Sequence, residues 1–330
     1  MWKGLAICAA LSGGGYALAR LAGGGISPLV FALALGVLVG NLPLRPDPRP
    51  LEAGLRFATR WLLRGGIVLF GLSVTLQQVL ALGPGVLLLD FVVIATILVA
   101  GFQIGTRWLG LDRETALLIS AGSAICGAAA VLATEATIRA RPAATAMAVA
   151  TVVLFGSLAM LVYPALFPLF GWDQGLYGIY IGATVHEVAQ VVAAGNAVGA
   201  DALANAVIVK LVRVMLLVPF LFIVGRWWLA RQPRPEGTPA RAARLPVPWF
   251  AFGFLAMVGV NSLVSIPGPL HDGLSLLGQA ALTMAMAALG FETRLEKLRA
   301  LGVSPLILGS ILFLLLITGG GAMTALIATI

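Results

Sequence analysis

Apolar segments recur along the whole chain of 330 residues, and most have a length close to that of a membrane-spanning helix. An α-helix needs about 20 apolar residues to cross the hydrocarbon core of a bilayer. Many of the segments are short and are interrupted by glycine or proline. The pattern predicts an all-α polytopic membrane protein with about 10–11 transmembrane helices. The segments are 4–22, 27–42, 65–81, 86–106, 115–138, 143–169, 175–196, 203–229, 247–266, 274–291 and 302–329.

Composition supports this class and excludes others. Hydrophobic residues make up 60% of the chain and charged residues only 10%, whereas a soluble domain carries about 25% charged residues. A soluble fold would have to bury this surface in one core, and cores stop growing near about 250–300 residues. We therefore exclude a soluble enzyme, a nucleic-acid module and a disordered chain. We expect one transmembrane domain over 1–330, with a first half at 27–170 and a second half at 175–330.

The net charge of +8 is concentrated in four short polar segments. Positively charged loops stay in the cytoplasm, so this distribution indicates membrane topology and not a nucleic-acid partner. The longest of the four is a predicted cytoplasmic linker at 230–246. With all four inside, the N-terminus is cytoplasmic and the C-terminus is outside. The basic residues are Arg45, Arg49, Arg56, Arg60 and Arg64 in 43–64, Arg107 and Arg113 in 107–114, Arg231, Arg234, Arg241 and Arg244 in 230–246, and Arg294, Lys297 and Arg299 in 292–301.

One pair of basic residues conflicts with eleven full spans. Arg139 and Arg141 would then lie outside. If segments 115–138 and 175–196 are re-entrant, this pair moves to the cytoplasmic side and the other loops keep their places. The sequence leaves both topologies open.

An internal repeat relates the two ends of the chain. Residues 69–89 align without gaps with 288–308, so that Gly71 meets Gly290 and Leu76 meets Leu295. Upstream of these stretches, Asn41 corresponds to Asn261 after a shift of one residue. Segments two to four thus resemble segments nine to eleven. Because an odd number of spans inverts orientation, we predict inverted-topology repeats, which are typical of secondary transporters.

Two segments carry small and polar residues at mid-length, where a lipid-facing helix would be apolar. They are 120–130, SAGSAICGAAA, and 182–190, GATVHEVAQ. We predict a broken or re-entrant helix in each, because unwound backbone is tolerated at membrane depth only when it is buried in protein or lines a cavity. Tight helix packing through small residues is the alternative. The candidate substrate-binding residues here are Ser120, Gly122, Ser123, Cys126, Gly127 and Thr184.

Ionisable residues within apolar segments are costly and usually functional. His186, Glu187 and Gln190 lie within about one helical turn, and we expect the first two to carry a coupled proton with Gln190 beside them. A neutral, hydrogen-bonded histidine is the alternative. Asn205, Lys210 and Arg213 follow in the next segment as candidate substrate ligands. Lys210 needs a partner such as Glu187, either as a structural ion pair or as an anion site.

Other features predict no chemistry. Asp90, near the start of its segment, is interpreted as interfacial. The two cysteines, Cys8 and Cys126, form no disulfide framework or zinc motif. The chain contains no Walker A motif, no H-E-x-x-H and no G-x-S-x-G. We therefore expect no enzyme activity, no cofactor and no metal.

Four stretches resemble the YeiH-like family of bacterial membrane proteins, to which sulfate export is ascribed. They are LFGLSVTL at 69–76, GSAICGAAAVLA at 122–133, GATVHEVAQVVAAG at 182–195 and KLVRVMLLVP at 210–219. The resemblance implies an inner-membrane protein of about ten or eleven helices with inverted repeats and crossing broken helices. Where the family has a serine after the Cys-Gly pair, this chain has Ala129, so one hydroxyl that could contact an ion is missing.

These observations together predict a secondary active transporter of a small inorganic or organic anion. The resemblance implies export of sulfate or sulfite coupled to protons. A cation/proton or sodium-coupled antiporter is the alternative, with Glu187 as cation ligand and Lys210 as its ion-pair partner. A non-transporting membrane sensor or partner subunit is the alternative of another class. The expected partners are the small anion, a coupling proton or sodium ion and the lipid bilayer, and the chain is compatible with a homodimer.

Overall fold

The computed structural model describes residues 1–22, 28–42, 49–230, 249–292 and 302–327. Within these ranges the chain is all-helical, with no β-strand, as predicted. The predicted linker 230–246 lies outside the described residues except for Ala230. Arg45 and the three basic residues of 293–301 also lie outside the described residues. The second copy of the repeat, 288–308, is therefore described only in part.

Six helices of the described chain are long and apolar enough to cross a membrane. They are α1 (Trp2–Leu21), α6 (Gly83–Gln103) continued by the π-helical turn η3 (Ile104–Trp108), α9 (Pro142–Phe170), α12 (Ala200–Met215) continued by α13 (Leu217–Leu229), α15 (Gly268–Glu292) and α17 (Val303–Ile327). Shorter apolar helices pack among them.

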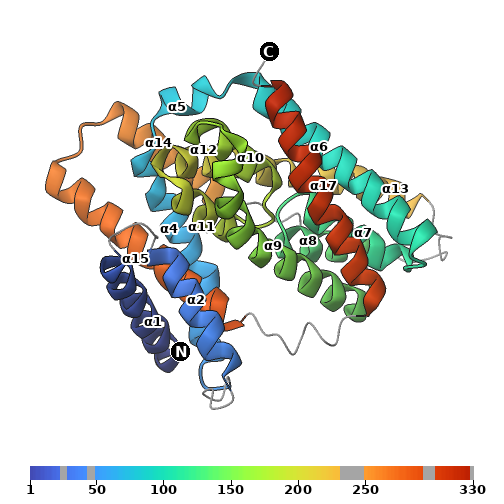
Figure 1. The fold of residues 1–330 in the computed structure, drawn as a ribbon, viewed down its shortest axis with the longest axis horizontal. Coiled ribbons are helices and arrows are strands. Elements are labelled where there is room, and N and C mark those ends of the chain that lie inside the picture. Colours follow the sequence, from blue (N-terminus) through green and yellow to red (C-terminus); the bar gives the residue numbers. More distant parts are fainter. Residues whose placement is uncertain (23–27, 43–48, 231–248, 293–301, 328–330) are drawn as a thin grey trace, which may run out of the picture.

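Two groups of helices lie side by side (Figure 1). The first, here called the peripheral bundle, contains α1, α2 (Pro28–Asn41), α3 (Glu52–Phe57), η1 (Ala58–Leu62), α4 (Leu63–Phe70), α14 (Trp249–Leu263) and α15. Glycines allow close packing within it: a Cβ at Gly36 would overlap the carbonyl oxygen of Ala287, and one at Gly290 would overlap that of Leu33.

The second group, here called the core bundle, contains α6, α7 (Arg113–Ala124), α8 (Ala128–Ile138), α9, α10 (Gln174–Thr184), α11 (Val188–Val198), α12, α13 and α17. The turn η2 (Gly71–Ser73) and the short helix α5 (Leu76–Ala81) connect the two groups. The largest hydrophobic cluster lies mostly in the core bundle and reaches α2, α4, α14 and α15.

Helices from the first part of the chain pack against helices from the last part in matching pairs. Helix α2 packs on α15, while α14 packs on α4. In the core bundle, α7 packs on both α6 and α17, and α10 also packs on both.

The third predicted segment is wrong at both ends. Residues 43–64 were expected to be a loop and 65–81 a single helix, but a helix begins at Glu52, runs through α3, η1 and α4 and ends near Phe70. Arg56 and Arg60 lie on the exposed face of this helix, while Leu55 and Ala58 on its other face are buried. An amphipathic helix end was thus mistaken for a loop, because its arginines interrupt the apolar pattern.

Candidate functional site

The first polar segment is a helix that breaks and folds back. Helix α7 ends at Ala124 and α8 begins at Ala128. Beyond the far ends of the two helices, the Arg141 guanidinium lies 2.8 Å from an Asp112 carboxylate oxygen and 3.0 Å from one of Glu114. The two ends of the segment therefore meet, and we call α7 and α8 the first hairpin.

The second polar segment has the same construction. Helix α10 ends at Thr184 and α11 begins at Val188. At the far ends, Gly199 lies against the side chain of Gln174, where a Cβ would overlap the amide oxygen. We call α10 and α11 the second hairpin. The predicted break in each segment is confirmed, and both segments fold back.

The two hairpins enter from opposite sides of the core bundle. Helix α9 begins at Pro142, beside the base of the first hairpin, and ends at Phe170, beside the base of the second. A helix of 29 residues is about 43 Å long, so the bases are far apart. The tips nevertheless touch, because the backbone N–H of Ala128 donates a 3.1 Å hydrogen bond to the Glu187 carboxylate.

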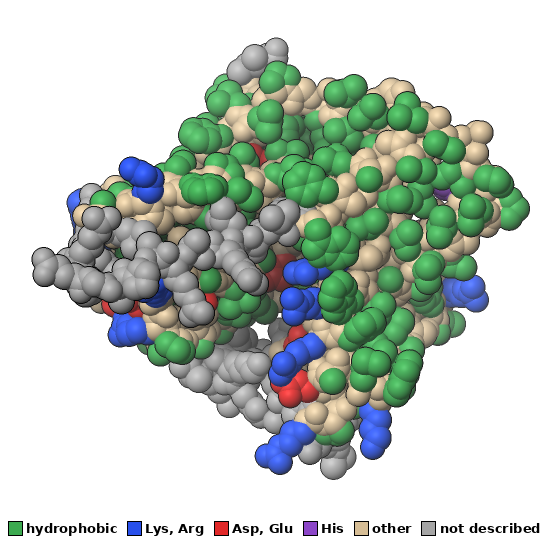
Figure 2. Space-filling model, turned by 180° about the vertical axis from the view of Figure 1, so that it is seen from behind, with side chains coloured by type: hydrophobic (Ala, Val, Ile, Leu, Met, Phe, Trp, Pro, Cys, Tyr) green, Lys and Arg blue, Asp and Glu red, His purple; other side chains and the backbone are tan. Residues whose placement is uncertain are grey.

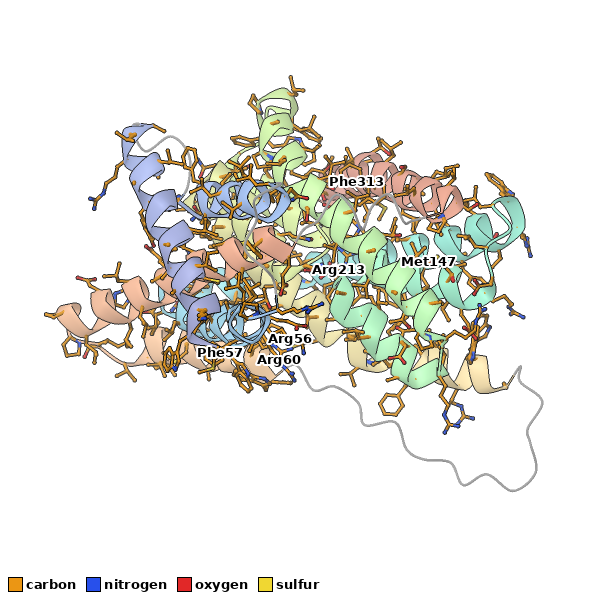
Figure 3. The ribbon with its side chains drawn as sticks, turned by 90° about the horizontal axis from the view of Figure 1, so that it is seen from below. Arg56, Phe57, Arg60, Met147, Arg213 and Phe313 are labelled. Carbon is orange, nitrogen blue, oxygen red and sulfur yellow. The ribbon has the colours of Figure 1, made fainter. Side chains whose placement is uncertain are left out.

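Helix α12 holds both tips through two buried cations. The Lys210 amine donates to the carbonyl oxygens of Ile125 at 2.6 Å and Val185 at 2.7 Å. Arg213 donates through Nε to the Ala124 carbonyl at 2.8 Å and through a terminal nitrogen to that of Ala183. Both side chains are fully buried, and Figure 3 places Arg213 at the centre of the molecule.

This arrangement corrects the partner expected for Lys210. Its hydrogen bonds go to backbone carbonyls and not to Glu187, and no ion pair joins the two among the described residues. The carbonyls at a helix C-terminus carry negative partial charge. Lys210 and Arg213 therefore neutralise the interrupted ends of α7 and α10.

Glu187 has the complementary role at a helix N-terminus. Its carboxylate accepts from the first N–H of α8, where the helix dipole favours negative charge. Gly127 makes this approach possible, because its φ is +66° and a Cβ there would overlap the Cγ of Glu187. The Glu187 N–H in turn donates to the Gln190 side chain at 2.9 Å. Each hairpin therefore contributes to holding the tip of the other.

Several other predicted ligands serve the backbone. The Ser120 hydroxyl donates to the Ala116 carbonyl and the Thr184 hydroxyl to the Tyr180 carbonyl. Asn205 donates to the carbonyl of Gly175 at the base of the second hairpin, away from the tips. Ser123 is buried. The Ser120 and Thr184 hydroxyls and the Asn205 amide position the hairpins.

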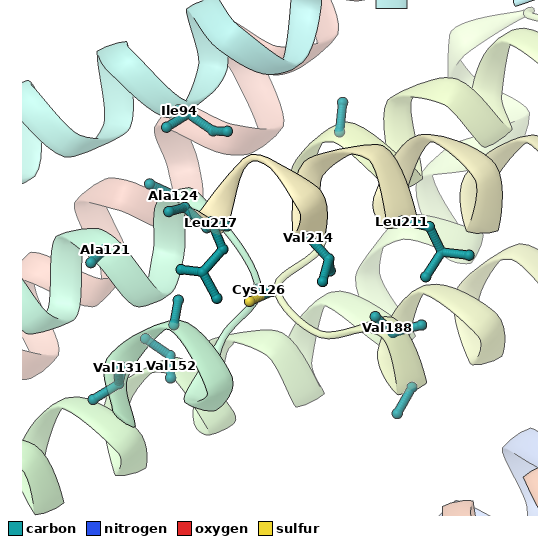
Figure 4. Packing of buried hydrophobic residues seen from close by; sticks show 14 of the residues in the cluster. Ile94, Ala121, Ala124, Cys126, Val131, Val152, Val188, Leu211, Val214 and Leu217 are labelled. Atoms are coloured by element: carbon teal, nitrogen blue, oxygen red, sulfur yellow. The ribbon is translucent and has the colours of Figure 1, made fainter. Parts of the chain in front are cut away.

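Gly122, His186 and Cys126 lie at or beside the tips. Gly122 is packed against Val131 and Val152. The His186 side chain is buried, and its Nδ1 has no hydrogen-bond partner among the described residues. The Cys126 thiol lies beside Val214 and Leu217 (Figure 4).

A cavity of about 240 Å³ lies between the tips and the peripheral bundle. The core bundle contributes Cys126, Ala128, Ala129, Glu187, Val188, Ala189, Val214 and Leu217 to its wall. The peripheral bundle contributes Thr59, Leu63, Arg64, Ile67, Trp249 and Phe250. The N-terminal turns of both α8 and α11 therefore face this space. Figure 2 shows a recess in the lower half of the molecule with acidic and basic side chains at its edge.

The residues missed from the sequence are those on the peripheral side of the cavity. Arg64 was assigned to a cytoplasmic loop, but it is half-buried and lies 5.6 Å from the centre of the Phe250 ring. Thr59 and Trp249 gave no signal in the sequence. The only hint in the sequence that Arg64 could line the site was its position at the start of an apolar run.

Asp90, interpreted from the sequence as interfacial, lies on α6 and is 0% exposed within the core bundle. Its burial among neighbouring helices was not predicted.

Comparison with known proteins identifies relatives among bacterial membrane proteins. The family model described as conserved hypothetical protein 698 matches residues 3–309. A UPF0324 membrane protein of Pseudomonas aeruginosa is 47% identical, covering 98% of this chain and 93% of the relative. The UPF0324 inner membrane protein YeiH of Salmonella typhimurium is 42% identical, covering 99% and 95%. The YeiH protein of Escherichia coli is 40% identical, covering 99% and 94%. No solved structure matches the chain.

Proposed function

The chain belongs to the UPF0324 family of inner membrane proteins that includes YeiH, and we propose that it is a secondary active transporter of a small anion coupled to protons. The observation that carries the proposal is the meeting of two oppositely inserted helical hairpins at a cavity between two helix bundles. Substrate sites of secondary transporters are typically formed by interrupted helices near the bilayer midplane.

The reciprocal helix contacts support an inverted repeat. A two-fold axis that exchanges α2 with α14 and α4 with α15 turns the α2–α15 contact into the α14–α4 contact. The same axis exchanges α6 with α17 and the first hairpin with the second, which matches the packing of α7 and α10 on both α6 and α17. Inverted repeats allow one bundle to move against the other about a fixed site. Counting the two hairpins as re-entrant segments leaves nine full spans.

The cavity has the features of an anion site. The N-terminal turns of α8 and α11 present positive partial charge to it, and Arg64 adds a full positive charge on the opposite wall. Lys210 and Arg213 contribute indirectly, because they neutralise the carbonyl ends of the same hairpins. The aromatic and aliphatic lining beside Arg64 favours an anion with an apolar part over bare sulfate.

Glu187 supplies the coupling in this proposal. Its carboxylate occupies the N-terminus of α8, the place where a substrate anion would be held. Protonation of Glu187 removes that negative charge and leaves the Ala128 N–H for the substrate. Proton and anion then bind together, with His186 and Gln190 as neighbours of the proton site.

The test is uptake of labelled anions into proteoliposomes with and without an imposed pH gradient. Sulfate, sulfite and small organic sulfonates form the panel. The Arg64→Ala variant should lose anion uptake, whereas Arg60→Ala, an exposed arginine one turn earlier, should retain it. Lys210→Ala should lose uptake by releasing both tips.

Wild-type uptake rates in Arg64→Ala would contradict the assigned site. Sodium-dependent proton exchange without any anion dependence would replace the proposal by the antiporter alternative, in which Glu187 binds the cation. No uptake in tightly sealed vesicles holding folded protein would remove anion transport.

A further inference from the structure

Asp90 is a buried carboxyl group for which the proposed mechanism has no use. It lies on α6, it is 0% exposed, and neither of its carboxylate oxygens has a hydrogen-bond partner among the described residues. A buried ionised carboxylate without hydrogen bonds is one of the most costly groups in a protein, and at membrane depth such a residue marks a functional site.

The cations that hold the hairpin tips are its electrostatic partners. Arg213 and Lys210 are the buried cations of α12, and α12 packs on α6, the helix that carries the buried Asp90. In this structure these two side chains donate instead to carbonyls at the ends of α7 and α10. This is the arrangement expected for a neutral Asp90, since an ionised carboxylate would compete for the same donors.

We propose that Asp90 is a second proton-binding residue, whose ionisation draws Lys210 and Arg213 away from the hairpin carbonyls. With a proton on Asp90, the two cations hold the tips as the structure shows. When the proton leaves to the aqueous phase, the carboxylate recruits one or both cations, and the carbonyls of Ala124, Ile125, Ala183 and Val185 lose donors. Proton binding thereby sets how tightly the two tips are held.

The titratable groups on the described helices that pack against α6 are these. Helix α12 carries Lys210 and Arg213, with the exposed Asp201 at its start, and α10 carries Tyr177 and Tyr180, whose hydroxyls donate to backbone carbonyls. Helix α7 carries Arg113 and Glu114 at its distant base, and α17 has no titratable residue in its described range. At the tips, Cys126, His186 and Glu187 are the groups whose titration must be separated from that of Asp90.

The first experiment needs no substrate. Hydrogen-exchange protection of peptides covering residues 122–130 and 183–190 is measured across pH in the full-length protein, corrected for intrinsic exchange. In the wild type, protection should fall as pH rises. Asp90→Asn, which mimics the protonated form, should keep high protection at every pH, and Asp90→Glu should restore the dependence at a shifted midpoint.

Two matched variants complete the test. Asp201→Asn alters an exposed carboxylate at the start of α12 and should behave as the wild type. In Glu187→Gln, the exchange protection of the peptide covering residues 122–130 should still fall as pH rises. A wild type without any fall in protection, or an Asp90→Asn protein with the wild-type fall, would overturn the inference.

Its consequence for transport rests on the proposed function. In proteoliposomes, Asp90→Asn should lose gradient-driven accumulation while retaining anion counterflow. Retained accumulation would overturn the coupling role. If the wild type moves no anion, the proposed function fails, while the exchange experiment still decides whether Asp90 controls the tips.

Discussion

At the residue scale, the buried charges at the centre of the molecule bind helix ends of opposite partial charge. Two cations meet the carbonyl ends of α7 and α10, and one carboxylate meets the N-terminus of α8. A charge buried alone would cost several kcal/mol, so each is satisfied by the broken backbone that it stabilises. The break and the charged residues therefore require each other.

Gly127 gives a prediction at this scale. Its positive φ disfavours any residue with a Cβ, and the added Cβ would also collide with Glu187. Gly127→Ala should lower thermal stability by more than the approximately 1–3 kcal/mol of backbone strain alone, and it should displace the carboxylate from α8. Thermal unfolding of the purified protein measures the effect.

Gly110 is the matched control for that variant. Its φ is +64° and no atom lies near the position of a Cβ, so Gly110→Ala carries backbone strain without a collision. Equal losses of stability in the two variants would show that the Glu187 contact contributes nothing.

At the scale of the element, each hairpin is fixed at its base as well as at its tip. Asp112 caps α7 by accepting from the Thr115 N–H at 3.0 Å, and it also pairs with Arg141 beyond the end of α8. The two arms of the hairpin are thus joined where they begin and end. Asp173 caps α10 in the same way through the Leu176 N–H.

Asp112 gives a pH prediction. Burial opposes its ionisation, but hydrogen bonds from Thr115 and the charge of Arg141 outweigh burial and hold its pKa below the ordinary value. Its ionised form therefore stabilises the fold above about pH 4, and this stabilisation is lost as pH falls through the lowered folded pKa.

Asp112→Asn should keep the cap and lose the ion pair, which is worth about 0–1 kcal/mol at an exposed site. Its melting temperature should fall below that of the wild type at neutral pH and converge with it in acid. Asp112→Ala also removes the cap, so its free energy of unfolding should be lower by a further loss of about 1 kcal/mol at every pH. A difference between Asp112→Asn and wild type that persisted unchanged into acid would contradict the assignment.

At the scale of the whole molecule, the hairpins remove the topological conflict. The base of the first hairpin carries Arg139 and Arg141, and its other arm begins at Arg113. If the hairpins are re-entrant, as the proposed function requires, both arms end on one side of the membrane and these arginines share the face of the basic loops. The positive-inside rule is then satisfied along the chain.

Cysteine labelling tests this topology. In a background without Cys8 and Cys126, Ala143→Cys, at an exposed position beside Arg141, should react with an impermeant thiol reagent only from the cytoplasmic side. Eleven full spans would place it outside. Asp201→Cys lies outside in both topologies and is the control. Reaction of Ala143→Cys from the periplasmic side alone would restore the full-span alternative.

The amino-acid sequence determined the features that depend on local composition. The apolar segments predict the helices, because length and hydropathy alone decide whether a helix suits a bilayer. The two breaks were visible because small and polar residues interrupt apolar runs around Gly127 and His186. Matched positions such as Gly71 and Gly290 are the basis on which the sequence predicts an inverted repeat.

Only the tertiary structure decided which groups meet. That the hairpins fold back depends on contacts such as Arg141 with Glu114, 27 residues apart. Lys210 binds carbonyls 85 and 25 residues away, and backbone acceptors leave no mark in the sequence because every residue carries one. Arg64 was misassigned to a loop and the burial of Asp90 was not predicted, because burial is a property of neighbouring helices, whereas the sequence shows only distance from the end of a segment.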